Sequence, residues 1–300
     1  MKVLVTGASG FVGSALVPFL AGEGHFVVRL VRSAPAPGHS DVLWDPERGT
    51  IDLDALEGMD AAVHLAGASI AASPWTAEGK RRIRESRVGG TRLLCESLSR
   101  LDRPPKTLVC ASAVGYYGDR GHEVLREDSP PGAGFLAQVC REWEAASEAA
   151  ERKGIRVVRL RIGMVLSAKG GALARMLGIF RAGLGGRVGS GAQYVSWIAL
   201  DDLVGAFDHA LRTKSLDGPV NAVAPRPVTN REFAKTLGRV LGRPSHLPAP
   251  AFAVRLFLGE MADELLLAST RVEPDRLLLS GYVFRYPELE GALRHLLGEA

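Results

Sequence analysis

T-G-A-S-G-F-V-G, residues 6 to 13, lies between a short apolar run and a predicted helix over 14–23. The first glycine of this stretch permits a tight turn, the second lets the backbone approach a pyrophosphate, and the third allows the helix to pack closely on the preceding strand. The helix N-terminus offers unpaired N–H groups and a positive dipole end to phosphates. In this context the pattern predicts dinucleotide binding, and a glycine turn that serves packing alone is the alternative.

Apolar strands alternate with amphipathic helices through the first half of the chain. This rhythm predicts an α/β fold, a Rossmann-type doubly wound parallel sheet with helices on both faces. The stretch between 32 and 59 contains three prolines and is predicted to be irregular. The predicted strands are 3–5, 26–31, 60–65, 107–111 and 155–161, and the predicted helices are 14–23, 78–100 and 135–153.

The pattern changes beyond about residue 163. Glycine-rich segments at 170–172 and 183–191 separate predicted helices rather than strands. A strand at 220–224 is expected to return to the sheet, and 227–300 is predicted to be helical, with Thr229 and Glu232 forming a capping box. We therefore predict a nucleotide-binding domain over 1–165, completed by the returning strand, and a smaller, mainly helical C-terminal lobe over 166–300.

Composition excludes several classes of protein. The 300 residues are 46% hydrophobic and 23% charged, as expected of a folded chain with a large core. The net charge of +4 comes from dispersed basic residues and does not predict nucleic-acid binding. No signal peptide precedes the first strand and no apolar run reaches the roughly 18 residues that span a bilayer, so we expect a cytoplasmic protein without membrane association. The three cysteines and seven histidines lack ligand spacing, and no metal site is predicted.

The end of the second predicted strand bears on the choice of dinucleotide. A site for NAD usually carries an acidic residue here, which accepts from the ribose 2′-hydroxyl. This chain instead has Arg32 and Ser33, a cation and a hydroxyl suited to a 2′-phosphate. NADP(H) is therefore the predicted cofactor, and a solvated arginine at a strand end is the alternative interpretation.

Several motifs resemble a known group. T-G-A-S-G-F-V-G, H-L-A-G at 64–67 and the hydroxyl residues at 112–117 resemble the extended short-chain dehydrogenase/reductase superfamily. More narrowly, the chain is similar to its "epimerase family" branch, related to the NAD(P)-dependent epimerases and dehydratases, with a C-terminal domain of unknown function. This narrower resemblance rests on W-T-A-E-G-K-R-R-I-R-E-S-R at 75–87, A-S-A-V-G-Y-Y-G at 111–118, F-L-A-Q-V-C-R-E-W-E at 135–144, G-S-G-A-Q-Y-V-S-W-I at 189–198 and G-Y-V-F-R-Y-P-E-L-E at 281–290.

Carried over to this chain, the resemblance implies a Rossmann fold with NADP(H) bound. The glycine loop would hold the pyrophosphate, and the segment after the third strand would pass beside the adenosine and ribose. Arg87 would reach the cofactor from the long helix, or else belong to a solvated basic helix face. Met164 would cover the nicotinamide, or else serve packing. The implied cofactor-binding residues are Gly7, Gly10, Phe11, Val12, Gly13, Arg32, Ser33, Leu65, Ala66, Gly67, Arg87 and Met164.

The usual catalytic pair of the superfamily is absent. There, a serine after this strand binds a substrate oxygen, and a Tyr-x-x-x-Lys on the next helix supplies a phenol and its ammonium partner. Aligned on Glu144, these positions are Leu136 and Cys140 in this chain. Lowering a phenol pKa from about 10 to near 7 requires roughly 4 kcal/mol, and no lysine stands on that helix face to provide it. Ser112 and Tyr116 are the remaining catalytic candidates, and lining a pocket is their alternative role.

Two functions stay open. One is an NADP(H)-dependent oxidoreductase or epimerase acting on a small polar or nucleotide-linked substrate. The other is an NADP(H)-sensing binding protein that is catalytically weak or inactive, which Leu136 and Cys140 favour. Both imply a small-molecule ligand, and we expect a monomer or homodimer.

Overall fold

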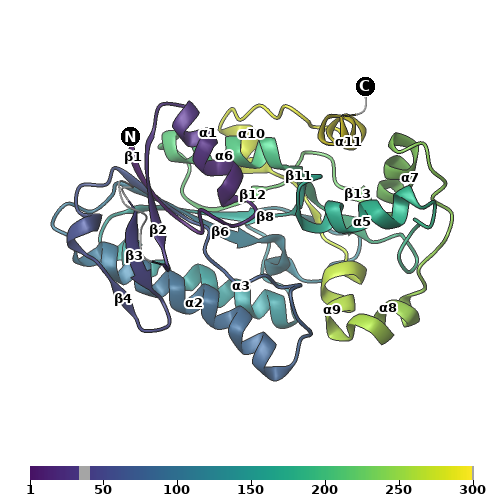
Figure 1. Cartoon of the computed structure of the whole chain (residues 1–300), viewed down its shortest axis with the longest axis horizontal. Helices are drawn as coiled ribbons and strands as arrows, with labels where there is room; N and C mark the ends of the chain where they lie inside the picture. Colours follow the sequence, from purple (N-terminus) through teal and green to yellow (C-terminus); the bar gives the residue numbers. More distant parts are fainter. Residues whose placement is uncertain (34–40, 299–300) are drawn as a thin grey trace. The chain divides into compact units, whose positions relative to one another are not determined.

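The computed structural model describes residues 1–33 and 41–298 of the chain. The chain divides into two compact units, each assembled from separate segments. Figure 1 labels the elements of both units. Unit 1 comprises Met1–Ser112, Val139–Leu160 and Phe207–Pro219, and unit 2 comprises Ala113–Gln138, Arg161–Ala206 and Val220–Ala300.

An eight-stranded sheet has the order β12-β8-β6-β5-β1-β2-β3-β4. Its strands are β1 Lys2–Thr6, β2 Phe26–Val31, β3 Val42–Asp45, β4 Thr50–Ile51, β5 Ala61–His64, β6 Thr107–Ala113, β8 Arg156–Ile162 and β12 Gly218–Ala222. The five strands β1 to β5 lie wholly in unit 1, whereas β6, β8 and β12 continue into segments of unit 2. β1 pairs in parallel with both β2 and β5, and β4 is antiparallel to β3. The predicted Rossmann-type α/β fold is confirmed.

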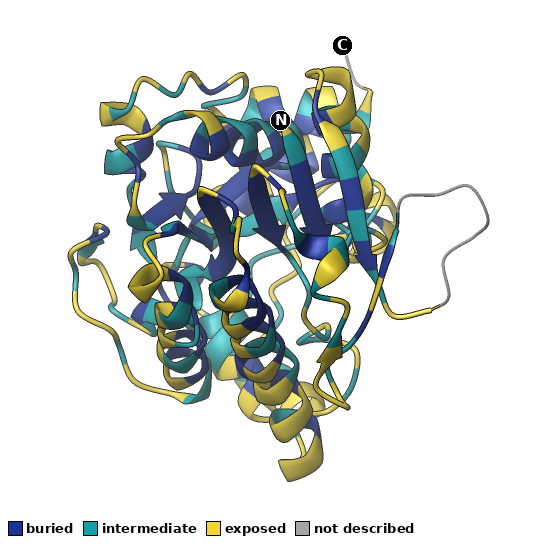
Figure 2. Ribbon diagram, turned by 90° about the vertical axis from the view of Figure 1, so that its left-hand side faces the viewer, coloured by how far each residue is buried: buried dark blue, intermediate teal, exposed yellow. Residues whose placement is uncertain are grey.

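Helices cover both faces of the sheet in unit 1. They are α1 Gly13–Gly22, α2 Ala77–Arg100, α4 Glu148–Arg152 and the parts of α3 Phe135–Ala145 and α6 Leu200–Arg212 that belong to this unit. α1 and α2 lie on opposite faces (Figure 1). Thr76 caps the N-terminus of α2, because its hydroxyl accepts the N–H of Gly79 at 3.1 Å. Figure 2 shows the strands largely buried and the helices with one buried and one exposed face, as amphipathic helices on a sheet require.

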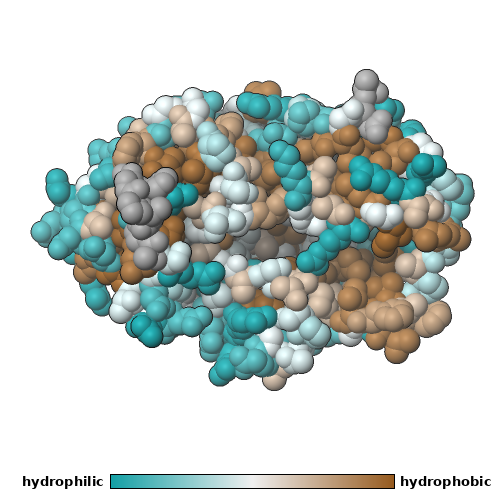
Figure 3. All heavy atoms as spheres, viewed as in Figure 1, coloured by the Kyte–Doolittle hydropathy of each residue, from teal (hydrophilic) through white to brown (hydrophobic). Residues whose placement is uncertain are grey.

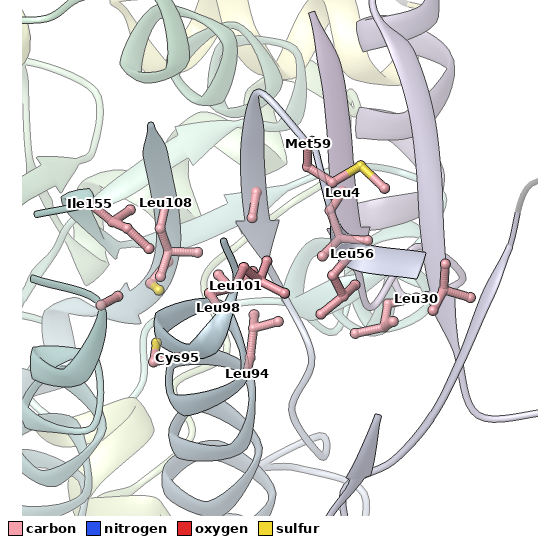
Figure 4. Close-up of a cluster of buried hydrophobic side chains, with 14 of the residues drawn as sticks. Leu4, Leu30, Leu56, Met59, Leu94, Cys95, Leu98, Leu101, Leu108 and Ile155 are labelled. Carbon is pink, nitrogen blue, oxygen red and sulfur yellow. The ribbon is translucent and has the colours of Figure 1, made fainter. Parts of the chain in front are cut away.

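The core of unit 1 lies between α2 and the sheet. Leu94, Cys95 and Leu98 occupy one face of α2, and all three are fully buried. Figure 4 shows this face against Leu4 of β1 and Leu108 of β6. Burying each leucine contributes about 1.5–3 kcal/mol, so this contact holds the long helix firmly against the sheet.

Unit 2 combines short strand pairs with helices around a second core. β9 Met164–Leu166 pairs with β11 Trp197–Ala199, β10 Tyr194–Val195 with β13 Val228–Thr229, and β7 Val124–Leu125 with β14 Arg271–Val272. Trp197, Phe233 and Leu293 are buried in this core. The helices are α5 Gly171–Arg181, α7 Asn230–Val240, α8 Ala251–Leu258, α9 Glu260–Ala262, α10 Asp275–Leu279 and α11 Leu289–Leu297.

The sequence-based element predictions differ from the structure in four places. One is the segment 227–300, predicted to be helical, which also contains the short strands β13 and β14. The stretch predicted to be irregular contains β3 and β4, where Trp44 is buried in the core of unit 1. The helix predicted over 135–153 ends at Ala145 and restarts at Glu148, because the hydroxyl of Ser147 donates to the carbonyl of Glu144 at 2.7 Å and competes with the helical hydrogen bonds. The segment 164–199 holds three short strands beside α5. The capping box of Thr229 is confirmed.

Apolar side chains are exposed along α8. Phe252, Leu256 and Phe257 expose 75%, 80% and 84% of their surface. Figure 3 shows the resulting apolar surface over α8 and α9. Over residues 1–33 and 41–298, no helix combines the length and the apolarity that crossing a bilayer requires.

Candidate functional site

The glycine loop joins β1 to α1 by a turn that leaves no room for a side chain at Gly7 or Gly13. Gly7 has a φ of +67°, and a Cβ atom there would lie 2.8 Å from the carbonyl carbon of Leu65. The N–H of Gly10 donates to the carbonyl of Gly7 at 2.9 Å, which closes the turn. A Cβ atom on Gly13 would lie 2.1 Å from the same carbonyl oxygen. The helix therefore begins in direct contact with the strand end, as the sequence pattern predicts.

α1 presents its N-terminus at this loop. The helix begins at Gly13 with Val12 as its N-cap residue, and no side chain caps it. Phe11 and Val12 are half-buried in the turn before it. The N–H groups of Ser14 and Ala15 already donate to the carbonyls of Gly10 and Val12, so the N–H groups of Phe11, Val12 and Gly13 are the ones that can donate to an anion. The helix dipole favours negative charge there.

Parallel pairing brings the other predicted cofactor residues of unit 1 to the same sheet edge. Thr6 at the end of β1 pairs with Leu30 of β2 on one side and with His64 of β5 on the other. The residues that follow these three positions therefore leave the sheet side by side. They are the glycine loop after β1, the exposed Arg32 and Ser33 after β2, and Leu65, Ala66 and Gly67 after β5.

The hydroxyl of Thr6 connects β1 to the loop after β5. Its Oγ1 accepts the N–H groups of Leu65 at 3.1 Å and Ala66 at 3.2 Å, and lies 2.7 Å from Nδ1 of His64. Since both oxygen lone pairs are used, the hydroxyl proton goes to Nδ1 and the neutral imidazole carries its own proton on Nε2. His64 is fully buried, with its ring edge-on to Trp44, and burial lowers its pKa to about 4.

Arg87 extends from α2 to the loop after β5. Its Nη1 donates to the carbonyl of Ala68 at 2.9 Å and to that of Ile83 at 3.2 Å. Its Cζ lies 5.2 Å from the ring centroid of Trp143, and a Cβ atom on Gly67 would be 3.5 Å from the same Cζ. The guanidinium is therefore not part of a solvated helix face but stands beside the strand-end loop.

Ser112, at the end of β6, is buried and engaged with a carboxylate. Its hydroxyl donates to Oε1 of Glu144 on α3 at 2.7 Å. A charge-assisted hydrogen bond of this kind fixes the rotamer of the serine and directs its proton toward the glutamate. The oxygen Oγ of Ser112 can therefore accept a hydrogen bond from a ligand, but its proton is already donated to Glu144.

The two tyrosines after β6 belong to unit 2 and differ in environment. Tyr117 is buried, and its hydroxyl lies 2.9 Å from the carbonyl of Arg126, 2.7 Å from Oδ1 of Asn221 and 2.9 Å from Nη1 of Arg161. Burial raises the pKa of Tyr117 to about 12, so it serves as a structural group. Tyr116 is half-buried and packs its ring against the guanidinium of Arg161, with the Cζ atom 3.5 Å from the ring centroid.

Leu136 and Met164 also lie in unit 2. Leu136 lines a cavity of about 240 Å³ together with Gly115 and Glu264. The carboxylate of Glu264 accepts the N–H groups of Phe135 at 2.6 Å and Leu136 at 2.7 Å, and so caps the start of α3. Met164 is half-buried in β9 and packs against the core of unit 2.

The sequence analysis gives no role to His64, Glu144 or Glu264. The one sequence signal for His64 is its place in the H-L-A-G motif, at the end of a buried strand. Glu144 and Ser112 are 32 positions apart, and Glu264 is 128 positions from Leu136. Contacts between residues so far apart in the sequence arise from the tertiary fold, and no local sequence pattern predicts them.

Comparison with known proteins places the chain in a family. The model of the NAD dependent epimerase/dehydratase family matches residues 3–223, and the model of a domain of unknown function, DUF1731, matches residues 249–296. The chain belongs to the NAD-dependent epimerase/dehydratase family. The resemblance to its branch with a C-terminal domain of unknown function is confirmed.

Relatives of this family member align over nearly its whole length. Epimerase family protein MT2273 of Mycobacterium tuberculosis is 44% identical over 291 residues, which are 97% of this chain and 96% of that protein. The crystal structure of human epimerase family protein SDR39U1 with NADPH superimposes with a TM-score of 0.91 at 37% identity and covers 100% of both chains. A nucleoside-diphosphate sugar epimerase from Corynebacterium glutamicum gives a TM-score of 0.82 at 39% identity, over 99% of this chain and 58% of that one.

Replacing Gly13 by alanine tests the close contact of α1 with β1. The new methyl group would collide with the Gly7 carbonyl, so we expect Gly13→Ala to lower the free energy of unfolding by about 1–3 kcal/mol. Gly22→Ala, in the same helix, is the matched control: nothing lies within 4 Å of its added Cβ. The control should gain up to about 1 kcal/mol from helix propensity. Equal stabilities of the two variants in urea denaturation would contradict the packing interpretation.

The low pKa of the buried His64 should make the folded protein less stable in mild acid. Its folded-state pKa of about 4 lies below the ordinary 6.5, so between these values the unfolded chain binds a proton that the folded chain does not. The stabilisation is complete above pH 6.5 and declines as the pH falls toward 4, with a loss of about 2 kcal/mol between pH 7 and pH 5. Urea denaturation at both pH values should show this loss in the unaltered protein.

Two variants assign that loss to His64. His64→Gln removes the titrating group and should reduce the difference between the two pH values by most of that amount. His246→Gln alters an exposed histidine and should leave it unchanged. If His64→Gln keeps the full pH dependence, another group is responsible.

Proposed function

We propose that the chain binds NADP(H) and acts as an oxidoreductase or epimerase on a small polar or nucleotide-linked substrate. The observation that carries the proposal is the glycine loop, in which the start of α1 comes so close to the end of β1 that a Cβ atom on Gly13 would lie 2.1 Å from the carbonyl oxygen of Gly7. The NADPH named in the crystal structure of human SDR39U1, a relative of the same fold and length, supports the choice of cofactor.

The residues of unit 1 fit a dinucleotide with a 2′-phosphate. The N-terminus of α1, with Phe11 and Val12, would donate N–H groups to the pyrophosphate. Arg32 and Ser33, at the neighbouring strand end, would hold the 2′-phosphate, and both side chains are exposed and available. Leu65 to Gly67 would line the adenosine side. When bound, NADP(H) supplies the hydride that such a reaction requires.

Ser112 would orient the reacting oxygen of the substrate. Because its proton is donated to Glu144, Oγ presents lone pairs and would accept a hydrogen bond from a substrate hydroxyl. Glu144 would keep that rotamer and could receive a proton passed through the serine. Tyr116, whose ring packs on Arg161, is the proposed phenol, and Met164 is proposed to cover the nicotinamide.

A second function is favoured by the apolar residues on α3. Leu136 and Cys140 offer neither a phenol nor a cation, so a protein that binds NADP(H) and responds to it without efficient turnover is the alternative. Incubation of the NADPH-loaded protein with nucleotide sugars, sugars and ketones separates the two. Oxidation of NADPH with any of them favours the enzyme, and stable NADPH throughout the set favours the sensor.

Arg32 should determine the preference between the two dinucleotides. If its guanidinium contacts the 2′-phosphate, NADPH binds at least about tenfold more tightly than NADH, a difference of about 1.4 kcal/mol. Arg32→Ala should remove most of that preference in calorimetry. Arg81→Ala removes an equal charge from an exposed pair with Glu78 on α2 and should preserve the preference. Equal affinities for NADPH and NADH in the unaltered protein would exclude this role.

Tyr116 should be required if the protein is an enzyme that uses this phenol. Tyr116→Phe is expected to lower turnover by about 10²–10⁴-fold with unchanged NADPH affinity, because it deletes a proton donor. Tyr286→Phe is the control, since it removes a hydroxyl from another tyrosine of unit 2 whose ring stacks on His295. Equal turnover of the two variants would assign Tyr116 to pocket lining.

A further inference from the structure

Arg87 is a partly buried cation without an acidic partner. Within residues 1–33 and 41–298, its hydrogen bonds go from Nη1 to the carbonyls of Ala68 and Ile83, and no carboxylate pairs with it. Other arginines of α2 behave differently, because Arg81 pairs with Glu78 and Arg84 with Glu142. Burial lowers the pKa of Arg87, which reflects the cost of holding an uncompensated charge at this place.

The side chain is nevertheless held in one position. The two carbonyls fix Nη1, and the ring of Trp143 supports the guanidinium at 5.2 Å from Cζ. Trp143 is itself buried, and its Nε1 donates to Oγ1 of Thr91 at 2.9 Å. A cation on an aromatic face is stabilised without being neutralised. Nε and Nη2 therefore keep their hydrogen atoms for another acceptor, since no acceptor for either is found in the described part of the chain.

Two neighbours of the guanidinium show where Nε and Nη2 lie. One is Gly67, at which a Cβ atom would be 3.5 Å from both Cγ and Cζ of Arg87. Gly67 follows β5 at the sheet edge that carries the glycine loop. The other is α3, whose Trp143 lies under the guanidinium and whose Cys140 stands three residues earlier on the same helix face. Cys140 is the position at which the Tyr-x-x-x-Lys pattern would place a lysine.

We propose that Arg87 supplies from α2 the positive charge that α3 lacks at Cys140, and that its free N–H groups bind oxygen atoms of the dinucleotide. The inference rests on the proposed binding of NADP(H) and adds the residue that takes over the role of the missing cation. A planar guanidinium donating two N–H groups suits a pair of ribose hydroxyls or phosphate oxygens. The buried charge of Arg87 lowers the stability of the protein without NADP(H), and the oxygen atoms of the bound dinucleotide would compensate it.

Relocating the cation tests this assignment. NADPH affinity is measured by calorimetry for the unaltered protein, Arg87→Met, Arg81→Ala and the double variant Arg87→Met/Cys140→Lys. Arg87→Met keeps the apolar stem on Trp143 and should weaken NADPH binding about tenfold or more, as loss of one charge-assisted contact predicts. Arg81→Ala should stay within about twofold. The double variant returns a cation to the same place from α3 and should recover most of the lost affinity.

Thermal unfolding distinguishes a binding role from a structural one. Without NADPH, the melting temperature of Arg87→Met should stay within about 2 °C of the unaltered protein, while the rise produced by saturating NADPH becomes smaller. A structural arginine would give the opposite result, a lower melting temperature without NADPH and an unchanged rise. Arg87→Lys, which retains charge, should bind NADPH more tightly than Arg87→Met even if the double variant does not fold.

Three outcomes would overturn the inference. They are unchanged NADPH affinity in Arg87→Met, a folded double variant that binds as weakly as Arg87→Met, and an Arg87→Lys variant no better than Arg87→Met. Each leaves the proposed function intact, because the unaltered protein still binds NADPH. Failure of the unaltered protein to bind NADPH would instead remove the proposed function and this inference with it.

Discussion

The hydroxyl of Thr6 holds together the strand ends on which the site of unit 1 depends. It accepts two N–H groups from the chain leaving β5 and gives its own proton to His64, so all its hydrogen-bonding capacity is used inside the fold. The bonded segment is also the one that excludes a side chain at Gly7, where a Cβ atom would lie 2.8 Å from the carbonyl carbon of Leu65. Without these hydrogen bonds, the segment after β5 would not be held against the turn at Gly7. The geometry of the glycine loop is therefore set partly by a neighbouring strand.

The charged groups of unit 1 are arranged in an unusual way for this superfamily. The helix that ordinarily carries a phenol and an ammonium group, α3, has apolar Leu136 and Cys140 at those positions, while its charged group is the carboxylate of Glu144 and a guanidinium comes from α2. Glu144 accepts a hydrogen bond from Ser112, and Arg87 extends from α2 to the ring of Trp143 on α3. A serine that offers lone pairs and a cation held by neutral carbonyls suit the binding of hydroxyl and phosphate groups. They do not by themselves provide a strong acid.

The buried polar groups of unit 2 form a hydrogen-bond network that makes this unit rigid. Glu127 is buried and accepts the N–H groups of Asn221 at 3.0 Å and Arg276 at 3.1 Å, and Asn221 in turn reaches the hydroxyl of Tyr117. Arg161 joins the same network through Tyr117. Because buried polar groups are stable when all their partners are in place, this network fixes the segment that carries Tyr116. The cavity beside Leu136 is bounded by the same segment and by Glu264.

The sequence by itself determined the elements whose signals are local. The glycine spacing, the alternation of apolar strands and helices, and the capping box at Thr229 each depend on residues within a few positions of one another, and all appear in the structure. The positions of Arg32 and Ser33 could also be predicted locally, because both residues directly follow a predicted strand. Their role toward a 2′-phosphate stays a prediction.

Only the tertiary structure decided how the polar side chains are paired. Whether Ser112 faces a ligand or a carboxylate depends on Glu144, and whether Arg87 is solvated or unpaired depends on Trp143 and on the loop after β5. The short strands β3 and β9 likewise follow from pairing with β2 and β11 rather than from their own three or four residues. Hydrogen bonding and burial of such groups are properties of neighbours distant in sequence, so composition and periodicity carry no information about them.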